Sequence, residues 1–288
     1  MLDVRHTGPR PSSRTSESLK RRTADRYGFL WKQSDPTAQP DEYHYDRVAC
    51  FLPTGHLRGR VLDAGCGDGI DTFRLARADG VEITAIDLTE EGLGRARRRT
   101  EGRTNVRFVQ GDLEHLPLRE GTFDFVYAYG VLHHLPRPGD GFRELVRVLK
   151  PGGMLAIYVY ENFGTRTSLE RLLLWLIGGF RHVTVRLPPM WLYQLCRIAS
   201  PLVFCALTLP ARLLARAPLT RRLSRRIPYH HGTGPFGLGG DLYDRFAAPI
   251  EYRYSRAEVA GWFLAAALTQ VSVRPMRGWV GYGVKPPG

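Results

Sequence analysis

Short apolar runs recur at regular intervals between residues 60 and 160, and each has the length and the β-branched or aromatic content of a strand. The runs span residues 60–65, 82–87, 105–110, 123–129 and 154–160. Helix-like segments separate them: in the last of these segments, Phe142, Leu145, Val146 and Leu149 follow the i, i+3, i+4, i+7 spacing of a helix face. Strands that alternate with helices in this way predict a parallel sheet covered by helices on both faces.

The C-terminal part of the chain predicts one more helix and a hairpin. Ser255 and Glu258 have the spacing of a capping box at the start of a helix. Apolar runs at 271–276 and 278–285 are close enough to pair as a hairpin. The predicted fold is therefore α/β, a Rossmann-like seven-stranded sheet that is mostly parallel with a C-terminal antiparallel hairpin, plus a helical insertion. This domain is expected at residues 25–160 and 246–288, with the insertion at 161–245.

The N-terminal residues and the cysteines indicate in which cellular compartment the protein is expected. Residues 1–24 are polar, lack an apolar core segment, and are expected to form a disordered tail rather than a secretory signal. The four cysteines form no CxxC pair and no His/Cys spacing typical of a metal site, so we expect reduced thiols, no bound metal and a cytoplasmic protein.

The sequence VLDAGCGDGID, residues 61–71, ends the first predicted strand in a glycine-rich loop. A dinucleotide fingerprint places its glycines as G-x-G-x-x-G, which Gly65 and Gly67 begin. Ile70 stands where the third glycine belongs, and the next glycine is Gly69. The loop is therefore out of register for a pyrophosphate site.

Two carboxylates follow later strands. Asp87 ends the second run, where it could accept hydrogen bonds from both hydroxyl groups of a ribose, and Asp112 follows the third run, where it could accept one from an adenine amino group. Taken singly, Asp87 could be only a helix N-cap and Asp112 only a turn residue. Together with Gly65 and Gly67 they meet at the carboxyl edge of the sheet, and this arrangement suits an adenosine without a pyrophosphate.

Five segments, VLDAGCGDG, ITAIDLT, VQGDLEHLP, FDFVYAYGVLHHL and LKPGGMLAIYV, occur in this order along the chain. They resemble the successive motifs of class I S-adenosylmethionine-dependent methyltransferases, and they are similar to the small-molecule branch that includes ubiquinone and menaquinone biosynthesis enzymes. The resemblance implies S-adenosyl-L-methionine as cofactor. It places Asp63 near the ammonium group of the methionine moiety, the backbone of Gly65, Cys66 and Gly67 against the cofactor, Asp87 with Leu88 at the ribose, Asp112 with Leu113 at the adenine, and Tyr129 beside the sulfonium and the acceptor. Residues 27–31 resemble a segment that folds over the cofactor.

Methyl transfer depends on alignment of the acceptor and, for an O–H or N–H acceptor, on a base. His133 and His134 directly follow the fourth strand, where either could be that base, although one of them could serve only to brace the loop. The stretch after that strand reads AYGV rather than the Pro-Pro motif of base-amino methyltransferases, and no cysteine follows a proline, as C5-cytosine enzymes require. Only Asp140 could serve as a metal ligand of a catechol-type enzyme there. These absences favour a small-molecule acceptor.

The net charge of +13 is concentrated in one segment, because residues 164–231 hold eleven arginines and the single acid Glu170. Apolar runs at 172–180 and 201–215 lie among these arginines. Three interpretations remain open: a helical lid packed on the sheet, the wall of a pocket for a hydrophobic acceptor, and contact with the anionic inner face of a membrane. Nucleic acid is disfavoured because few aromatic residues are placed for stacking.

A membrane-spanning helix is not predicted in this segment. Helices of about 12 residues would reach about 18 Å, against about 30 Å of bilayer hydrocarbon. The longer apolar window 187–210 contains Arg197 and four prolines. The chain is thus expected to methylate a small, hydrophobic molecule such as a quinone, lipid or natural product. The alternatives are an RNA methyltransferase that uses the basic insertion, or a non-catalytic fold that binds the cofactor or a partner.

Overall fold

A computed structural model describes residues 13–33, 35, 37, 43–162, 164, 168–217, 219–224, 227, 234–235 and 237–288. The chain divides into two compact units. The sheet unit comprises residues 1–171 and 249–288, and the helical unit comprises residues 172–248. The insertion was expected at 161–245, which begins eleven residues earlier and ends three residues earlier than the helical unit.

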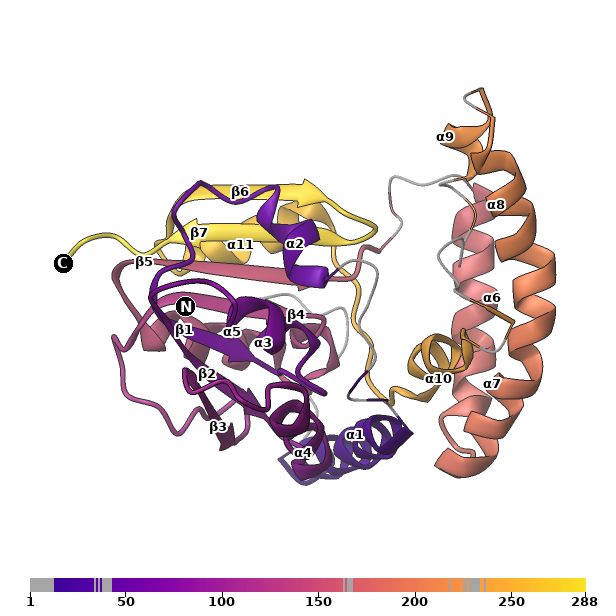
Figure 1. Cartoon of the computed structure of the whole chain (residues 1–288), viewed down its shortest axis with the longest axis horizontal. Helices are drawn as coiled ribbons and strands as arrows, with labels where there is room; N and C mark the ends of the chain where they lie inside the picture. The colour runs from indigo at the N-terminus through magenta and orange to yellow at the C-terminus, as the bar shows by residue number, and fades with distance from the viewer. Residues whose placement is uncertain are drawn as a thin grey trace. The chain divides into compact units, whose positions relative to one another are not determined.

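The sheet unit is built on seven strands: β1 (Gly59–Ala64), β2 (Val81–Asp87), β3 (Val106–Gln110), β4 (Phe123–Tyr129), β5 (Leu149–Val159), β6 (Thr269–Pro275) and β7 (Trp279–Val284). Their order is β3-β2-β1-β4-β5-β7-β6 (Figure 1). The first five strands are parallel, while β7 pairs antiparallel with both β5 and β6. The predicted fold is confirmed, and with it the C-terminal hairpin.

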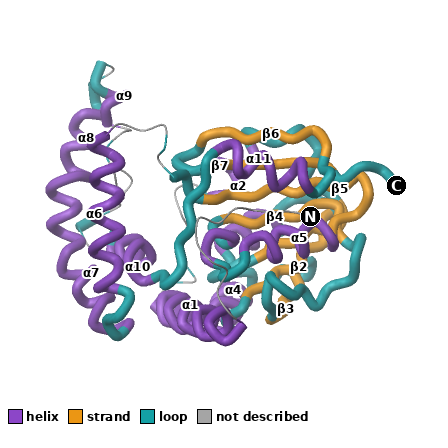
Figure 2. The backbone as a smooth tube through the Cα atoms, turned by 180° about the vertical axis from the view of Figure 1, so that it is seen from behind, coloured by secondary structure: helices purple, strands orange, loops and turns teal. Residues whose placement is uncertain are grey.

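Helices cover both faces of this sheet (Figure 2). On one face, α5 (Pro138–Val148) and α11 (Arg256–Ala265) contribute Phe142, Leu145 and Phe263 to a buried core. On the other face, α2 (His44–Ala49) and α3 (Ile70–Leu75) contribute Val48 and Leu75. Strands β1, β2 and β4 are thus buried from both sides, which explains their nearly unbroken apolar runs.

Local signals place most element boundaries correctly. The capping box predicted at α11 is present: Ser255 Oγ accepts from Glu258 N at 3.2 Å, and Ser255 N donates to Glu258 Oε2 at 2.7 Å. Leu149 was expected to close a helix face but begins β5 instead, because it pairs with Phe123 on β4. Here the pairing partner on the neighbouring strand outweighs the helical spacing.

The disordered tail expected over residues 1–24 is wrong from residue 13 onward. Helix α1 spans Ser13–Gln33, and it packs on α4 (Glu90–Arg99). Its contacts include an ion pair between Lys32 and Glu91 at 3.0 Å and a buried Leu30. Polar composition concealed this helix, since its main partners are charged groups far away in the sequence. Residues 1–12 lie outside the described part of the chain.

The helical unit contains most of α6 (Ser168–Thr184), followed by α7 (Pro189–Val203), a π-helical turn η2 (Phe204–Thr208), α8 (Leu209–Ala215), α9 (Arg221–Ser224) and α10 (Gly239–Ala247). Both long helices contact α10: Phe180 on α6 lies edge-on to Phe246, and Tyr193 on α7 lies edge-on to Tyr243, with ring centroids 5.6 and 5.7 Å apart. These contacts give the unit a small core of its own.

The expectation of short helices in this unit is wrong. Segments α7, η2 and α8 form one continuous helix, Pro189–Ala215, of 27 residues. Each internal proline removes one hydrogen bond, and the π turn between Pro201 and Pro210 takes up the local irregularity. Among the described residues this is the one helix long and apolar enough to cross a membrane, which by itself is weak evidence that it does.

Candidate active site

The glycine-rich loop joins β1 to α3 and bends sharply at its glycines. Gly67 and Gly69 have φ angles of +52° and +81°, a region that side chains rarely adopt. A Cβ atom on Gly67 would lie 2.8 Å from Cζ2 of Trp31, and one on Gly69 would lie 2.6 Å from Cα of Ala96. The loop therefore needs glycine at both positions, and its bare backbone lies against α1 and α4.

Asp87, at the end of β2, reaches across to this loop. Its Oδ2 accepts from Gly67 N at 2.9 Å, and its Oδ1 accepts from Thr89 N and Thr89 Oγ1 at 2.8 and 2.7 Å. Burial raises the pKa of Asp87 above its usual value, although these hydrogen bonds oppose the shift. The carboxylate is thus held at the carboxyl edge, between the loop and the first turn of α4.

Asp63, in β1, is almost fully buried and accepts a hydrogen bond from Thr72 Oγ1 at 2.6 Å. Burial raises the pKa of Asp63 to about 7, and the nearby negative charges of Asp71 and Asp87 add to the shift, while the bond from Thr72 opposes it. A cation bound beside Asp63 would therefore stabilise its ionised form.

Asp112 follows β3, and its two oxygens already have partners. Oδ2 lies 2.5 Å from Nζ of Lys20 on α1, and Oδ1 accepts from Glu114 N at 2.8 Å. Burial favours the protonated acid, but the Lys20 ammonium and the Glu114 amide outweigh it and lower the pKa of Asp112. The neighbouring Leu113 is buried in the core beneath α5, whereas Leu88 beside Asp87 is 38% exposed.

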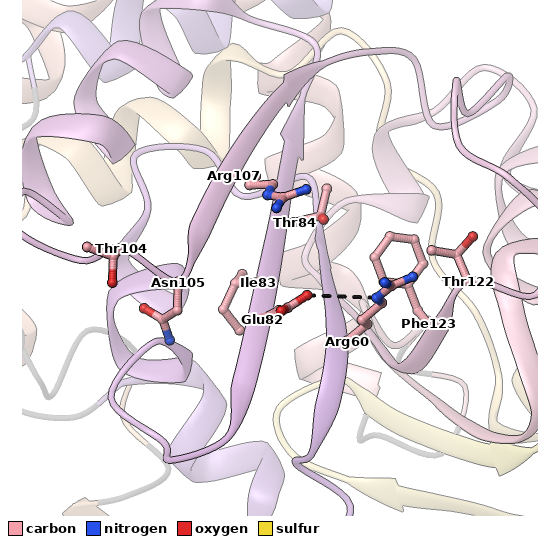
Figure 3. Close-up of a pocket in the computed structure, with 9 residues that line it drawn as sticks. All are labelled: Arg60, Glu82, Ile83, Thr84, Thr104, Asn105, Arg107, Thr122 and Phe123. Carbon is pink, nitrogen blue, oxygen red and sulfur yellow. Dashed lines mark ion pairs between the residues drawn. The ribbon is translucent and has the colours of Figure 1, made fainter.

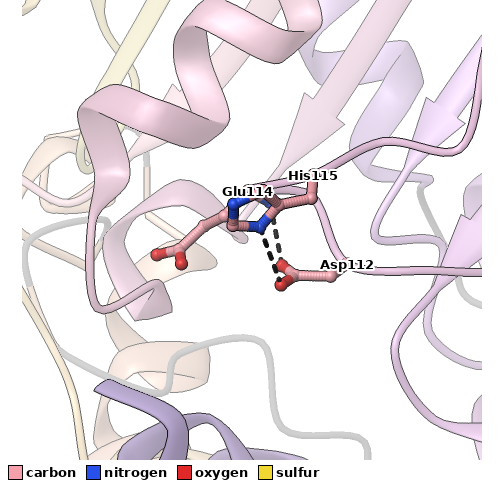
Figure 4. Close-up of side chains that lie close together, drawn as sticks. All are labelled: Asp112, Glu114 and His115. Atoms are coloured by element: carbon pink, nitrogen blue, oxygen red, sulfur yellow. Dashed lines mark hydrogen bonds and ion pairs between the residues drawn. The ribbon is translucent and has the colours of Figure 1, made fainter. Parts of the chain in front are cut away.

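Asp112, Glu114 and His115 bring three potential metal ligands together (Figure 4). Lys20 Nζ lies 2.7 Å from Oε2 of Glu114, and the same carboxylate accepts from Arg137 N at 2.6 Å and Nη2 at 3.2 Å. Two cationic side chains thus neutralise this acidic group, so the cluster is an ion-pair network that joins α1 to the sheet.

His134 lies in the one-turn helix η1 (Leu132–His134) with both ring nitrogens engaged. Its Nδ1 is 2.6 Å from the carbonyl oxygen of Ile250, and its Nε2 is 2.9 Å from Oη of Tyr27 on α1. A carbonyl can only accept, so Nδ1 carries the proton, and Nε2 of the neutral ring accepts from the tyrosine hydroxyl. His133 is fully buried and stacks on Tyr160 at 3.9 Å.

Aromatic rings line the end of β4 and β5. Tyr129 is stacked between His44 and Tyr158, with a centroid distance of 4.4 Å on each side. Burial raises the pKa of the Tyr129 phenol far above its usual value, so the ring stays neutral. His44 Nδ1 is 3.5 Å from Oδ2 of Asp71; burial lowers the pKa of this histidine, but Asp71 outweighs burial and raises it. Sequence reasoning found Tyr129 but missed His44.

The polar hollow in Figure 3 lies elsewhere. It is lined by residues such as Arg60, Glu82 and Arg107, near the amino-terminal ends of β1, β2 and β3. Ligands of open α/β sheets bind at the carboxyl ends of the strands, where Asp63, Asp87 and Asp112 converge. The hollow is therefore not the candidate site.

Lys20 is the main addition to the predicted site, and it lies on α1 together with Tyr27 and Trp31. Residues 27–31 were singled out by resemblance, but Lys20 was assigned to the tail. Leu19, Thr23, Tyr27 and Leu30 recur at intervals of three and four, a signal that could have extended the helix to Lys20.

Residues 62–157 match the family model described as a methyltransferase domain. The chain is 38% identical over 115 residues to 27-O-demethylrifamycin SV methyltransferase of Amycolatopsis mediterranei, covering 39% of this chain and 42% of that protein. It is 40% identical over 117 residues to demethylmenaquinone methyltransferase of Clavibacter sepedonicus, covering 40% of this chain and 47% of that protein. The matches span about half the length of these relatives or less.

A match in the solved structures extends over more of the chain. The DhpI–SAH complex has a TM-score of 0.55 and 19% sequence identity, covering 95% of this chain and 99% of that one. At this identity the likeness shows the fold alone. The family match rests on the five motifs around residues 62–157, and the resemblance drawn from them is confirmed. Residues 62–157 thus match a methyltransferase domain and are similar to S-adenosylmethionine-dependent methyltransferases of class I.

Proposed function

We propose that this chain transfers a methyl group from S-adenosyl-L-methionine to a small, apolar molecule. Asp63, Asp87 and Asp112 lie at or near the carboxyl ends of the neighbouring strands β1, β2 and β3 at one edge of the sheet, and Asp87 bonds to the glycine-rich loop there; this arrangement carries the proposal. These three carboxylates suit a ligand with an ammonium group, a ribose diol and an adenine amino group. When bound, this cofactor supplies a methyl group on a positively charged sulfur, which is an excellent leaving group.

Each carboxylate is proposed to bind one part of the cofactor. Asp63 faces the ammonium group, Asp87 accepts from the ribose hydroxyls, and Asp112 with Leu113 frames the adenine. Asp87 and Asp112 already accept hydrogen bonds from Thr89 and Lys20, and each carboxylate has lone pairs left to accept a bond from the ligand.

The backbone of Gly65 to Gly67 and the side chain of Leu88 complete the proposed cofactor contacts. Burial raises the pKa of the Cys66 thiol well above its usual value, so this residue contributes its backbone and a small neutral side chain rather than a nucleophile.

The aromatic rings favour an apolar acceptor. His44, Tyr129 and Tyr158 form one stack at the ends of β4 and β5, and His133 and Tyr160 form a second. Both faces of Tyr129 are covered and His133 is fully buried, so the rings make this end of the sheet apolar rather than offering a free stacking face. The names of two relatives, a demethylrifamycin and a demethylmenaquinone methyltransferase, point to acceptors of this general kind.

Of the two histidines, His134 is the better base. The Nδ1–H bond to Ile250 fixes its orientation and leaves Nε2 as the acceptor of a proton. Tyr27 already donates to that nitrogen at 2.9 Å, so its hydroxyl can pass a proton from the acceptor to His134. His133 is fully buried, and its stacking on Tyr160 suits a bracing role.

Calorimetry with S-adenosylmethionine tests the cofactor assignment directly. We expect wild type to bind and Asp87→Ala to bind at least tenfold more weakly, about 1.4 kcal/mol or more, because a charge-assisted hydrogen bond is lost. Glu82→Ala is the matched control, since its side chain is 72% exposed at the opposite edge of the sheet. Absence of binding in wild type, or equal binding by Asp87→Ala, contradicts the assignment.

Transfer of labelled methyl groups to a panel of quinones, phenolic polyketides and RNA then tests the acceptor class. Product with RNA alone would favour the nucleic-acid alternative. Cofactor binding with no product in any class would favour a binding protein without catalytic activity.

A further inference from the structure

The helical unit exposes an unusual amount of apolar side chain. Of the sixteen exposed large hydrophobic residues in the described part of the chain, all but Leu88 and Leu264 lie in this unit. Trp175 and Trp191 are 72% and 69% exposed. Soluble surfaces rarely leave so many bulky residues uncovered together, and such patches mark sites of interaction.

On α6 the exposed apolar residues follow one helix face. They are Leu172, Trp175, Leu176, Phe180 and Val183, at intervals of one to four residues that keep them on one side. The opposite side of the helix packs on α10, where Arg181 Nη2 donates to Ala248 O at 2.7 Å and Thr184 Oγ1 donates to Phe246 O at 2.9 Å. Apart from the edge of Phe180, which meets Phe246, the stripe is therefore exposed in the part of the helical unit that the structure describes.

The long helix Pro189–Ala215 carries a second stripe. Its members are Trp191, Leu195, Ile198, Leu202, Leu209 and Leu213, spaced by three, four or seven residues. The inner face is different: Leu192, Cys196 and Ser200 are buried, and Ser200 Oγ donates to Pro235 O at 2.7 Å. The helix is thus amphipathic, and its inner face packs within the helical unit.

The charge of the unit is strongly positive. Residues 172–248 contain ten arginines, no lysine and two acids, Asp241 and Asp244, giving a net charge of +8. Long-range repulsion between two such units opposes self-association, whereas an anionic surface attracts them. Arginines beside exposed tryptophan and leucine match the pattern of helices that lie in a membrane interface.

We propose that the helical unit binds an anionic membrane surface, with α6 and the long helix lying in the plane of the interface. Spanning is disfavoured because Arg197 and Arg212 interrupt the helix and because its inner face packs on the polar helix α10. The inference is independent of the proposed function, since vesicle binding is measured without methyl transfer. If the chain does not bind vesicles, the cofactor assignment is unaffected. If the chain does not bind the cofactor, the membrane proposal is unaffected.

Flotation of the full chain with vesicles tests the proposal. We expect binding to phosphatidylcholine vesicles that contain about 30 mol% phosphatidylglycerol, and binding at least tenfold weaker to phosphatidylcholine alone. The double substitution Trp191→Glu/Ile198→Glu should abolish flotation, because binding would then bury two negative charges in the membrane interface. Arg212→Gln with Arg216→Gln should weaken binding about 30-fold, since each arginine near the surface contributes about a factor of five.

Leu264→Glu is the matched control, because Leu264 is 64% exposed but belongs to α11 in the sheet unit. It should float like the parent, and circular dichroism should confirm that every variant is folded. The proposal fails if the folded parent ignores anionic vesicles, or if Trp191→Glu/Ile198→Glu binds as well as the parent. It also fails if the backbone amides of both stripes are protected from hydrogen exchange in the absence of lipid. A parent protein that is a dimer, and that Trp191→Glu/Ile198→Glu converts to a monomer, would contradict it as well. Those outcomes would assign the stripes to the sheet unit or to a second copy.

Discussion

Asp63 is a buried carboxyl group whose charge changes with pH near neutrality. Its pKa is raised from 3.8 to about 7, first by burial and then by the charges of Asp71 and Asp87. Between these two values the folded chain holds a proton that the unfolded chain has lost, so the contribution of Asp63 to stability falls as pH rises through this window. Burial favours the protonated form of Asp63, whereas a bound ammonium group stabilises the ionised carboxylate.

Cofactor affinity should therefore fall as pH falls. We expect S-adenosylmethionine to bind about tenfold more weakly near pH 6 than near pH 8, because most Asp63 side chains must lose a proton before binding. Calorimetry in buffers of different ionisation enthalpy should detect this proton release near pH 6. In Asp63→Asn the binding should be weak and nearly independent of pH. The same pH dependence in wild type and in Asp63→Asn would assign the effect to another group.

His134 is expected to act on turnover rather than on cofactor binding. In His134→Asn the amide nitrogen can still donate to Ile250, but no basic nitrogen faces Tyr27. For an O–H or N–H acceptor found in the screen, kcat should fall by about 10²–10⁴, with the cofactor Kd unchanged. His182→Asn is the control, because this exposed histidine lies on α6 in the helical unit. Unchanged kcat in His134→Asn would falsify the role as base.

At the scale of elements, the glycine-rich loop and α4 offer a matched pair of substitutions. Gly69→Ala combines a φ of +81° with a Cβ position 2.6 Å from the backbone of Ala96, so the loop or α4 must move. We expect the free energy of unfolding to fall by more than about 1 kcal/mol. Gly94→Ala, within α4 and with no atom within 4 Å of its new Cβ, should instead raise it by up to about 1 kcal/mol. Urea unfolding measures the free energy of unfolding of both variants. An equal change in the two variants would contradict the close approach of Gly69 to the backbone of Ala96.

Sequence predicts elements well where the determining contacts are local or periodic. The strands follow from apolar runs buried on both faces, and the start of α11 follows from Ser255 and Glu258. Helix α1 was missed at its start because Lys20 is stabilised by Asp112 and Glu114, far away along the chain. The long helix was missed because the prolines of the window 187–210 were interpreted as interruptions, whereas a π turn follows Pro201 and the helix continues.

The predicted site residues divide in a similar way. Motif spacing brings Asp63, Asp87 and Asp112 to the edge of the sheet where the structure has them, because parallel strands end together. His44 could not be predicted, since its place beside Tyr129 depends on how α2 packs against the sheet. The partner of His134, the carbonyl of Ile250, likewise comes from a segment after the insertion.

At the scale of the whole molecule, the site and the excess charge belong to different units. The carboxylates, His134 and Ile250 lie in the sheet unit, while ten arginines and both apolar stripes lie in the helical unit. The sheet unit has its own two buried cores, so replacing residues 172–248 by a flexible glycine–serine linker should leave a folded domain.

This shortened chain should bind S-adenosylmethionine within about twofold of wild type, because every proposed cofactor contact comes from residues of the sheet unit. It should also lose flotation with anionic vesicles, since both apolar stripes are gone. Calorimetry measures cofactor binding, thermal unfolding measures folding, and flotation measures vesicle binding, all on one preparation. Asp87→Ala in the shortened chain is the control for specific cofactor binding. A shortened chain that unfolds cooperatively but no longer binds the cofactor would show that the helical unit contributes to the site, contrary to the assignment of all cofactor contacts to the sheet unit.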